Sequence, residues 1–204
     1  MKPNKKKLIY LISPNKIYKN FFIDLKLVLK TQKVFFFQMR FKRYSLKKKI
    51  LFGKKIKRIC KNYNVKFLIN DDPHLSKKLS ADGCHLGQKD MNISKARKII
   101  GDKIIGITCH NSIKLAKIAI KEKASYLAFG AFYSSKTKKA RYLARTQILN
   151  KTKRLTQIPL VAIGGINSDN YKNLLLNNAD FLAISGYIWN NKKYKPLDAI
   201  KKIK

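Results

Sequence analysis

Carboxylates are scarce in this chain, and they gather in one short stretch. The 204 residues include 10 Asp and Glu against 47 Lys and Arg. Residues 70–90 hold four of the acids: Asp71, Asp72, Asp82 and Asp90. Asp71 and Asp90 each follow an apolar run, and two hard oxygen ligands with positions left for water and a substrate phosphate suit Mg²⁺. We take Asp71 and Asp90 as candidate metal ligands, while the simpler interpretation stays open that Asp71 caps a helix and Asp90 is an ordinary loop acid.

Three long polar side chains precede these acids in a Q-x-R-x-K pattern. Gln38, Arg40 and Lys42 alternate along the chain, and a period of two places them on the same side of an extended segment. Arginine binds phosphate oxygens as a fork and lysine binds them as a point charge. The pattern indicates a diphosphate clamp beside the acids, although in a chain so rich in lysine it is weak by itself.

Glycines lie near the ends of two later apolar runs. Gly164-Gly165 lies near the end of the seventh run, and Ser185-Gly186 lies in the second half of the eighth. Bare backbone N–H groups at such positions bind a single phosphate in many α/β barrels. Tight turns between strand and helix explain the same glycines equally well.

Two Cys-His pairs are weaker candidates. Cys84-His85 and Cys109-His110 could supply a zinc site, but adjacent residues in a strand point to opposite faces. Packed core cysteines and hydrogen-bonded histidines are the better interpretation. Asp82, before the fourth run, fits a turn at the opposite end of the fold. We find no G-x-S-x-G elbow and no nucleophile paired with a base.

The elements that must position these residues are short apolar runs separated by helical segments. Eight runs have the length of a strand and suit strands covered on both faces: 8–13, 34–40, 66–71, 83–87, 104–110, 125–133, 159–166 and 181–188. The clearest helical spacings lie at 17–30, 46–63, 111–123 and 168–178, the last with Ser168 as its expected N-cap. Repeated strand and helix units predict the α/β class, and eight strands favour a single closed (β/α)8 TIM barrel. We expect one domain over residues 1–204, compact over about 8–190.

In such a barrel the polar residues after the strands meet at one rim, where the active site lies. Asn70 and Asp71 follow the third run, Thr108 lies near the end of the fifth, and the sixth leads into the segment 134–139. The rim therefore has two expected anion-binding ends, one assisted by a metal and one built from backbone amides.

Charge and cysteine content limit the setting. The net charge of +37 attracts polyanions, but the lysines are spread along the whole chain together with Asn and Ile, which indicates codon bias more than a nucleic-acid footprint. The three cysteines are odd in number and form no C-x-x-C pair, so a reducing cytoplasm is expected. The N-terminal apolar run is shorter than a signal peptide needs, and no run is long enough to span a membrane.

Several motifs together resemble the thiamine phosphate synthase (thiamine-phosphate pyrophosphorylase) family. They are FFFQMRFK, LINDDPHLSKKLSADGCHLGQKDM, GITCHN, GAFYSSKTKK, VAIGGIN and AISGYI, in this order. The Asn-Asp pair with DG-x-HLGQ-x-D is the most specific part. The resemblance runs from about residue 8 to residue 190.

The resemblance implies a barrel enzyme that joins hydroxymethylpyrimidine diphosphate to thiazole phosphate with Mg²⁺ and releases pyrophosphate by a dissociative route. It implies these diphosphate and pyrimidine contacts: Gln38, Arg40, Lys42, Asn70, Thr108 and Lys138. Arg40, Thr108 and Lys138 would serve catalysis, and Asp71 and Asp90 would bind the metal. The implied thiazole phosphate contacts are Ser135, Thr137, Gly165, Ile184 and Ser185. The partners would be these small molecules, with no specific nucleic acid and no membrane; assembly into a homo-oligomer stays open.

The chain departs from the family pattern near the expected thiazole site. Gly130-Ala131 stands where Gly-Pro is usual, Ser134 replaces a second proline, and Ser135 stands where Thr is usual. Thr108 occupies a position that is usually Ser and keeps the hydroxyl. These changes bear on affinity for the thiazole more than on the reaction.

Three other functions compete with synthesis. A thiazole tautomerase-like relative on the same barrel would have little need for both the two acids and the Gln38, Arg40 and Lys42 clamp. A nucleic-acid-binding protein would show salt-sensitive binding without a response to thiazole phosphate. A binder of thiamine precursors without enzymatic activity stays open from the sequence.

Overall fold

A computed structural model describes residues 7–134 and 143–203 and shows a closed barrel of eight parallel strands in the order β1 to β8. The strands are β1 (Ile9–Ile12), β2 (Val34–Met39), β3 (Lys66–Asn70), β4 (Gly83–Leu86), β5 (Ile104–His110), β6 (Tyr126–Gly130), β7 (Leu160–Ile163) and β8 (Phe181–Ile184). β1 pairs with both β2 and β8, which closes the ring. The predicted (β/α)8 TIM barrel is confirmed.

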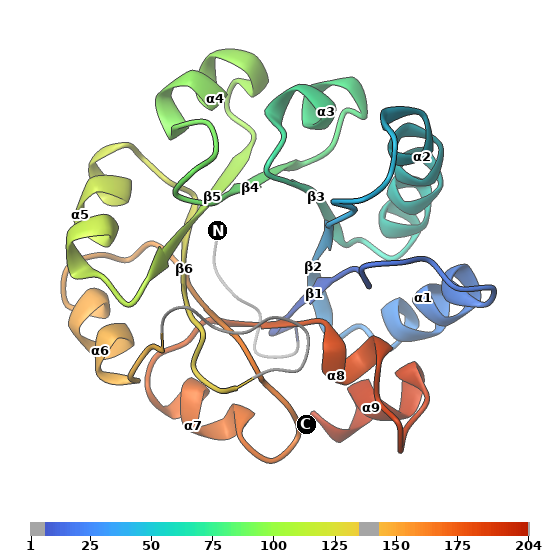
Figure 1. The fold of residues 1–204 in the computed structure, drawn as a ribbon. Coiled ribbons are helices and arrows are strands. Elements are labelled where there is room, and N and C mark those ends of the chain that lie inside the picture. The colour runs from blue at the N-terminus through green and yellow to red at the C-terminus, as the bar shows by residue number, and fades with distance from the viewer. Residues whose placement is uncertain (1–6, 135–142, 204) are drawn as a thin grey trace.

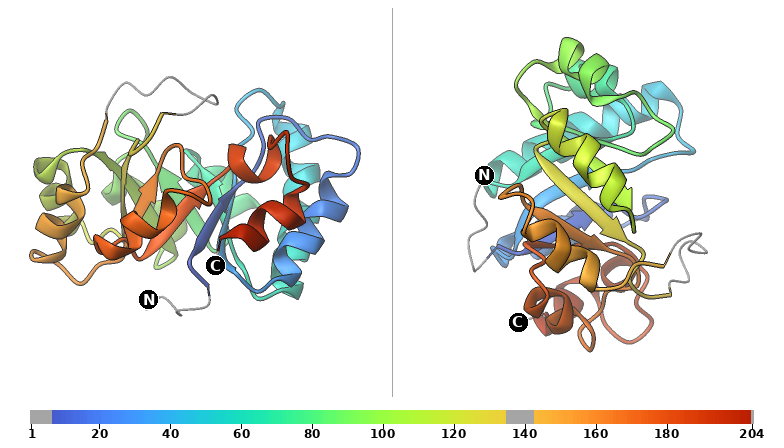
Figure 2. Two further views of the ribbon diagram at one scale, coloured as in Figure 1. Left: turned by 90° about the horizontal axis from the view of Figure 1, so that it is seen from below. Right: turned by 90° about the vertical axis from the view of Figure 1, so that its left-hand side faces the viewer.

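Helices surround the strands as an outer layer (Figure 1). They are α1 (Phe21–Lys30), α2 (Leu46–Asn62), α3 (Pro73–Lys78), α4 (Ile93–Ile100), α5 (Ile113–Lys121), α6 (Gln147–Lys153), α7 (Tyr171–Leu176), α8 (Gly186–Trp189) and α9 (Pro196–Lys202). The last helix, α9, packs beside the first helix, α1, which completes the outer layer next to β1 and β8 (Figure 2).

Local sequence explains where several helices begin. The side chains of Ser45, Asp72, Asn92 and Ser112 each accept a hydrogen bond from the backbone N–H three residues later, at the starts of α2, α3, α4 and α5. Such caps satisfy N–H groups that a helix leaves unpaired. The loops after β2, β3, β4 and β5 are therefore fixed at both ends, by a strand and by a capped helix.

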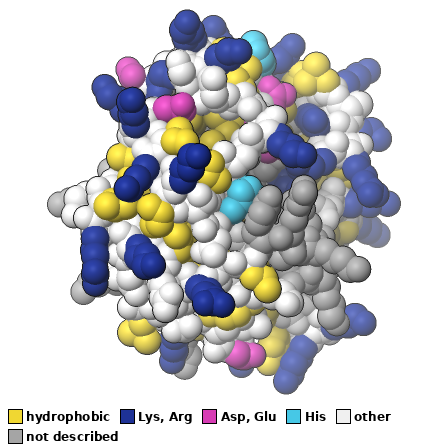
Figure 3. All heavy atoms as spheres, turned by 60° about the vertical axis from the view of Figure 1, so that its left-hand side comes forward, with side chains coloured by type: hydrophobic (Ala, Val, Ile, Leu, Met, Phe, Trp, Pro, Cys, Tyr) yellow, Lys and Arg dark blue, Asp and Glu magenta, His cyan; other side chains and the backbone are white. Residues whose placement is uncertain are grey.

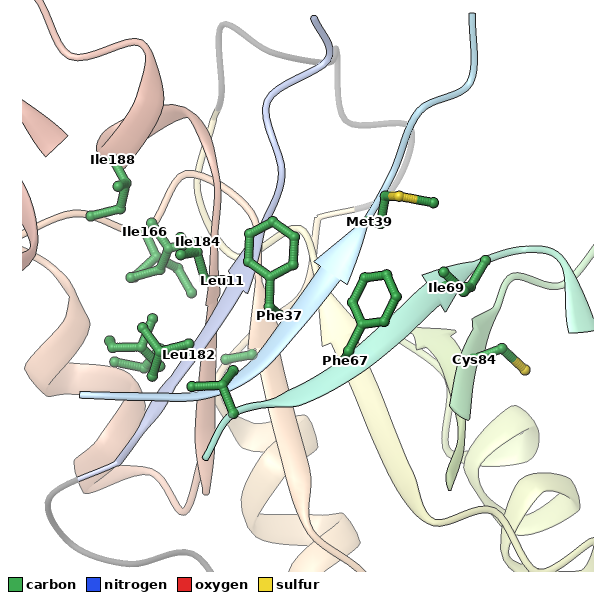
Figure 4. Close-up of a cluster of buried hydrophobic side chains, with 14 of the residues drawn as sticks. Leu11, Phe37, Met39, Phe67, Ile69, Cys84, Ile166, Leu182, Ile184 and Ile188 are labelled. Atoms are coloured by element: carbon green, nitrogen blue, oxygen red, sulfur yellow. The ribbon is translucent and has the colours of Figure 1, made fainter. Parts of the chain in front are cut away.

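Two apolar layers hold the barrel together. The outer layer lies between strands and helices and includes Phe37, Phe67, Ile69, Cys84 and Leu182 (Figure 4). The inner layer fills the barrel itself with alternate residues of the strands: Tyr10, Ile12, Phe36, Leu68, Tyr126, Ala128, Val161, Phe181 and Ala183. Because side chains alternate across a strand, the same strands supply both layers.

Three expected boundaries were wrong. The run 181–188 contains all of β8 and most of the short helix α8, because continuous apolarity does not separate a strand from a buried helical turn. The run 125–133 leaves the sheet after Gly130. Ser168 does not cap α7, which begins at Tyr171 after Asn170; the Ser168 hydroxyl donates to Asp169 instead.

Candidate active site

The expected diphosphate clamp begins inside the barrel and spreads over its mouth. Gln38, in β2, is buried, and its Nε2 donates to the Tyr10 hydroxyl at 2.9 Å. β2 ends at Met39, so Arg40 and Lys42 lie beyond the strand. The Arg40 guanidinium donates to Asn15 Oδ1 at 3.2 Å, and Lys42 Nζ lies 2.9 Å from Asp71 Oδ2. Gln38 therefore lies inside the barrel, whereas Arg40 and Lys42 lie beyond the strand, and each of the three has a different partner.

Asp71 lies at the end of β3 in a conformation that most side chains avoid. Its φ is +65°, and its N–H donates to the His85 carbonyl at 2.8 Å, which ties the turn after β3 to β4. The next residue, Asp72, caps α3 through the N–H of Leu75. The cap is thus supplied by Asp72, and the Asp71 carboxylate remains at the mouth with Lys42 as its ion pair.

Asp90 lies in the turn after β4, where its carboxylate accepts the Gly87 N–H at 2.7 Å. Partial burial raises the pKa of Asp90 above its ordinary value, and the nearby Asp71 carboxylate raises it further, while Gly87 and Lys42 act in the opposite direction. A cation bound beside Asp90 would relieve the repulsion that hinders its ionisation. Adjacent strands therefore bring the two predicted metal ligands together.

The donor set at this point fits Mg²⁺ better than zinc. Among the described residues, no group of three or more His, Cys, Asp or Glu side chains could hold a metal by itself. Two carboxylates suit a cation that keeps several waters and takes further oxygens from a substrate phosphate. Cys84 and Cys109 are buried, with burial raising each thiol pKa to about 12, and Cys84 packs in the outer layer, on the other side of β4 from the His85 ring.

A chain of hydrogen bonds crosses the inside of the barrel below the mouth. The Tyr10 and Tyr126 hydroxyls are 2.7 Å apart, Tyr126 lies 2.9 Å from His85 Nδ1, and His85 Nε2 lies 2.9 Å from Thr108 Oγ1. The pKa of His85 is lowered to about 4, chiefly by burial; Asp71 opposes this shift and Arg40 adds to it. His85 is therefore neutral at neutral pH.

Sequence reasoning missed this chain. With Gln38, which donates to Tyr10, it connects β1, β2, β4, β5 and β6, and only the register of the closed barrel shows that these five side chains meet. One signal was present: Tyr10 and Tyr126 each place a hydroxyl in a run of otherwise apolar residues, and a buried tyrosine hydroxyl usually has a partner.

The glycine-rich side of the mouth is built from backbone. Gly164 and Gly165 have φ values of +105° and +63°. A Cβ on Gly165 would lie 2.4 Å from the Ser134 carbonyl oxygen and 2.7 Å from the Tyr133 Cβ. The Asn170 side chain donates to the Gly165 carbonyl at 3.0 Å and holds this turn. The two glycines therefore allow the loops after β6 and β7 to approach closely.

The structure describes some of the other predicted site residues and not the rest. Asn70 ends β3 beside His85 of β4. Ile184 is buried at the end of β8, and the Ser185 hydroxyl donates to the Ser13 carbonyl at 3.1 Å, beside the mouth. Ser13 also accepts the Arg40 N–H through its hydroxyl, so it links the two sides of the mouth. Ser135, Thr137 and Lys138 lie outside the described residues.

Comparison with known proteins gives one consistent answer. A family model described as thiamine monophosphate synthase matches residues 9–188. A thiamine-phosphate synthase of Pelagibacter ubique is 64% identical over 100% of both chains, and one of Erythrobacter litoralis is 37% identical over 94% of this chain and 92% of the relative. The chain belongs to the thiamine monophosphate synthase family. This membership makes it an enzyme of the transferase class.

Solved structures support the same family and show how widely the fold is shared. A thiamine phosphate pyrophosphorylase from Pyrococcus furiosus superposes with a TM-score of 0.85 at 27% identity, covering 97% of this chain and 94% of the other. A 3-hexulose-6-phosphate synthase superposes with a TM-score of 0.64 at only 13% identity, which shows the barrel alone. The barrel is therefore common to different enzymes, and the fold alone does not identify the activity.

Basic side chains are dispersed over one face of the molecule. On the face in Figure 3, Lys and Arg side chains are spread over the surface with acidic, apolar and uncharged groups between them. No helix in the described parts of the chain is long and apolar enough to cross a membrane. A dispersed distribution of this kind differs from the single basic stripe that is typical of nucleic-acid readers.

Proposed function

We propose that the protein is a thiamine-phosphate synthase that joins hydroxymethylpyrimidine diphosphate to thiazole phosphate and releases pyrophosphate with Mg²⁺. The observation that carries the proposal is the pairing of Asp71 and Asp90 at the mouth, with Lys42 ion-paired to Asp71 and Arg40 following β2 nearby. A tautomerase-like relative has no diphosphate to hold and no use for this set. Family membership supports the same activity.

In the proposed mechanism the residues of the protein bind and orient the charged groups of the substrates. Arg40, Lys42 and Asn70 hold the diphosphate, joined by Lys138, which lies outside the described residues. A Mg²⁺ ion held by Asp71 and Asp90 would neutralise negative charge that develops on the departing pyrophosphate. Departure leaves a cationic methylene carbon on the pyrimidine, and the thiazole nitrogen attacks it with its lone pair. Breaking this C–O bond and forming the C–N bond requires no protein nucleophile.

The second substrate is assigned to the glycine-rich side. Gly165, Ile184 and Ser185 would hold the thiazole phosphate, with Ser135 and Thr137 from the undescribed segment. Backbone N–H groups next to glycine suit a single phosphate because no Cβ blocks its approach. Binding the two substrates on opposite sides of one mouth places the thiazole nitrogen near the methylene carbon that it attacks, and such positioning accelerates the reaction.

The remaining parts of the proposal concern setting and assembly. Cys60, Cys84 and Cys109 are free and buried, which agrees with the expected reducing cytoplasm. We propose small molecules as the partners and assign no nucleic acid and no membrane. Assembly into a homo-oligomer is left to a measurement of mass in solution.

The proposed function is tested by pyrophosphate release. The purified protein is given both substrates with and without Mg²⁺, and in parallel each substrate alone. We expect release only when both substrates and Mg²⁺ are present. Release from the pyrimidine diphosphate alone would make the protein a hydrolase. No release in any mixture, together with isomerisation of a thiazole phosphate precursor, would favour the tautomerase-like function.

A further inference from the structure

We propose that Gln38, Tyr10, Tyr126, His85 and Thr108 form a hydrogen-bond chain with one direction, which presents the Thr108 hydroxyl hydrogen to the mouth of the barrel. In this arrangement Tyr10, Tyr126 and His85 are positioning residues. None of the three needs to touch a substrate, because each acts through the next side chain. The direction of the chain is a property of the folded protein, whereas its use in the reaction rests on the proposed function.

Counting hydrogens gives the direction. Gln38 Nε2 can only donate, and it lies 2.9 Å from the Tyr10 oxygen. Tyr10 has one hydroxyl hydrogen and one further partner, the Tyr126 hydroxyl at 2.7 Å, so it donates there. Tyr126 in turn has one hydrogen, and its remaining partner is His85 Nδ1 at 2.9 Å. Nδ1 therefore accepts.

An acceptor at Nδ1 fixes the rest of the chain. A neutral imidazole with an accepting Nδ1 carries its hydrogen on Nε2. His85 Nε2 then donates to Thr108 Oγ1, which lies 2.9 Å away. The Thr108 hydroxyl oxygen therefore accepts a hydrogen bond from His85, and its own hydrogen is available to donate to another acceptor. The Thr108 carbonyl is already engaged by the Gln88 side chain.

The surroundings shield the tyrosines of this hydrogen-bond chain from water and hold their rings in place. Tyr10 and Tyr126 are 1% and 0% exposed, and burial raises the pKa of both phenols, so each keeps the hydrogen that the chain needs. The His85 ring stacks on the Tyr126 ring at 12° between planes. A Cβ at Gly106 would lie 1.8 Å from Tyr126 Cζ. Gly106 in β5 therefore provides the space that the Tyr126 ring occupies.

The direction depends on one group, the Gln38 amide. If its oxygen instead of its nitrogen faced Tyr10, every hydrogen bond in the chain would reverse, and Thr108 would donate back to His85. With the nitrogen inward, Thr108 can donate to an acceptor atom on a substrate. A pyrimidine ring nitrogen is an acceptor of this kind, and threonine, with its branched Cβ, holds its hydroxyl in fewer rotamers than serine does.

The test is to determine which ring nitrogen of His85 carries hydrogen, by ¹⁵N NMR of protein labelled at histidine. The protein has three histidines, and His85→Gln identifies the resonances of His85 by their loss. We expect hydrogen on Nε2 in the unmodified protein. Gln38→Glu, measured near pH 9 where the carboxylate is ionised and can only accept, should move the hydrogen to Nδ1.

Two further variants complete the test. Gln147→Glu makes the same chemical change at the start of α6, away from the hydrogen-bond chain, and should leave the His85 hydrogen on Nε2. Tyr126→Phe removes the donor to Nδ1 and should leave His85 without a fixed tautomer. Hydrogen on Nδ1 in the unmodified protein, or no response to Gln38→Glu, would overturn the inference.

Kinetics then test the use of the chain. Tyr126→Phe and Thr108→Val should each lower kcat about tenfold, as expected for one lost hydrogen bond, with a smaller effect on KM. The double variant should be little worse than either single variant, since both break the same chain. Additive losses would deny the chain its role in catalysis. Absence of the synthase reaction in the unmodified protein would remove the proposed function and leave the NMR result intact.

Discussion

The two sides of the barrel mouth are built in different ways. After β2 to β4, charged side chains form the mouth: Arg40, Lys42, Asp71 and Asp90. After β6 and β7, the chain turns on Gly130, Gly164 and Gly165, all with positive φ. On the first side the chemistry depends on the charges of the side chains. On the second side it depends on glycines, whose missing Cβ atoms allow the backbones of two loops to approach each other.

This difference changes what a substitution does on each side. A conservative change on the charged side removes a charge and leaves the fold intact, since Lys42 and Asp90 are exposed and the helix cap is on Asp72. On the glycine-rich side the smallest addition, one methyl group, would collide with backbone atoms. We therefore expect effects on turnover from the first side and combined effects on stability and binding from the second.

The largest expected effect is on the charged side. Asp71→Asn should lower kcat by about 10²- to 10³-fold, the usual cost of losing one group that stabilises developing charge. Thiazole phosphate binding should change little, because that substrate is assigned to the other side. Initial rates of pyrophosphate release at saturating substrates give kcat, and titration of thiazole phosphate by calorimetry gives its affinity.

Asp72→Asn is the matched control for Asp71→Asn. It removes the same charge one residue away, and asparagine still caps α3. Equal losses in the two variants would mean that net charge at the mouth, and no specific metal ligand, determines the rate. A normal rate for Asp72→Asn with a low rate for Asp71→Asn would support the metal assignment.

The next effect is on the glycine-rich side. Gly165→Ala should lower the free energy of unfolding by about 1–3 kcal/mol, since it adds a strained φ to a collision with the Ser134 carbonyl. It should also raise KM for thiazole phosphate more than KM for the pyrimidine diphosphate. Urea denaturation and separate substrate titrations measure the two effects.

Gly101→Ala separates strain from collision. Gly101 has a φ of +59°, close to that of Gly165, but a Cβ there would meet nothing within 4 Å. We expect it to cost about 1 kcal/mol, from backbone strain alone. If both variants lost the same stability, close approach of the loops would not explain Gly165, and the contrast between the two sides of the mouth would disappear.

The raised pKa of Asp90 predicts how the charged side responds to pH. A metal ligand must be ionised, so Mg²⁺ affinity should increase as pH rises through the pKa of Asp90 and level off above it. Because that pKa lies above the ordinary aspartate value, the decrease should begin at a higher pH than for an ordinary aspartate. Calorimetric titration of Mg²⁺ against pH measures this dependence.

Stability without metal should show the opposite sign. A raised folded-state pKa means that the folded protein binds the proton more tightly than the unfolded chain does, so the free energy of unfolding falls as pH rises through that window. Asp90→Asn should remove this fall and weaken Mg²⁺ binding at all pH values. An unchanged pH profile in Asp90→Asn would show that another group titrates.

The same contrast explains what the sequence could predict. Continuous apolar runs predicted the eight strands because every strand is covered on both faces. The charged site residues could be predicted because their chemistry and spacing follow directly from the sequence. Gly165 was found as a glycine, but its close approach to Ser134 depends on two loops 31 residues apart in the chain. Nothing local to either loop determines that distance.

The chain from Gln38 to Thr108 lies further from sequence reasoning. Its five members come from five strands, and their meeting depends on the closure and register of the barrel. Tyr126 also needs the space left by Gly106, a residue on another strand. Residues whose role depends on contacts across the barrel are visible only when the barrel is closed.

The smallest expected effect tests whether the charged side is needed for folding at all. Lys42→Met removes the 2.9 Å ion pair with Asp71 and keeps an unbranched chain of similar length. Because the Lys42 side chain is 56% exposed, the free energy of unfolding should change by less than about 1 kcal/mol. KM for the pyrimidine diphosphate should rise several-fold, since one cation is lost from the clamp. Lys66→Met, at a second exposed pair with Asp82, should match it in stability and leave KM unchanged. A loss of stability well beyond that of Lys66→Met would mean that Lys42 holds the turn after β3 in place, and the two sides of the mouth would then both depend on structure.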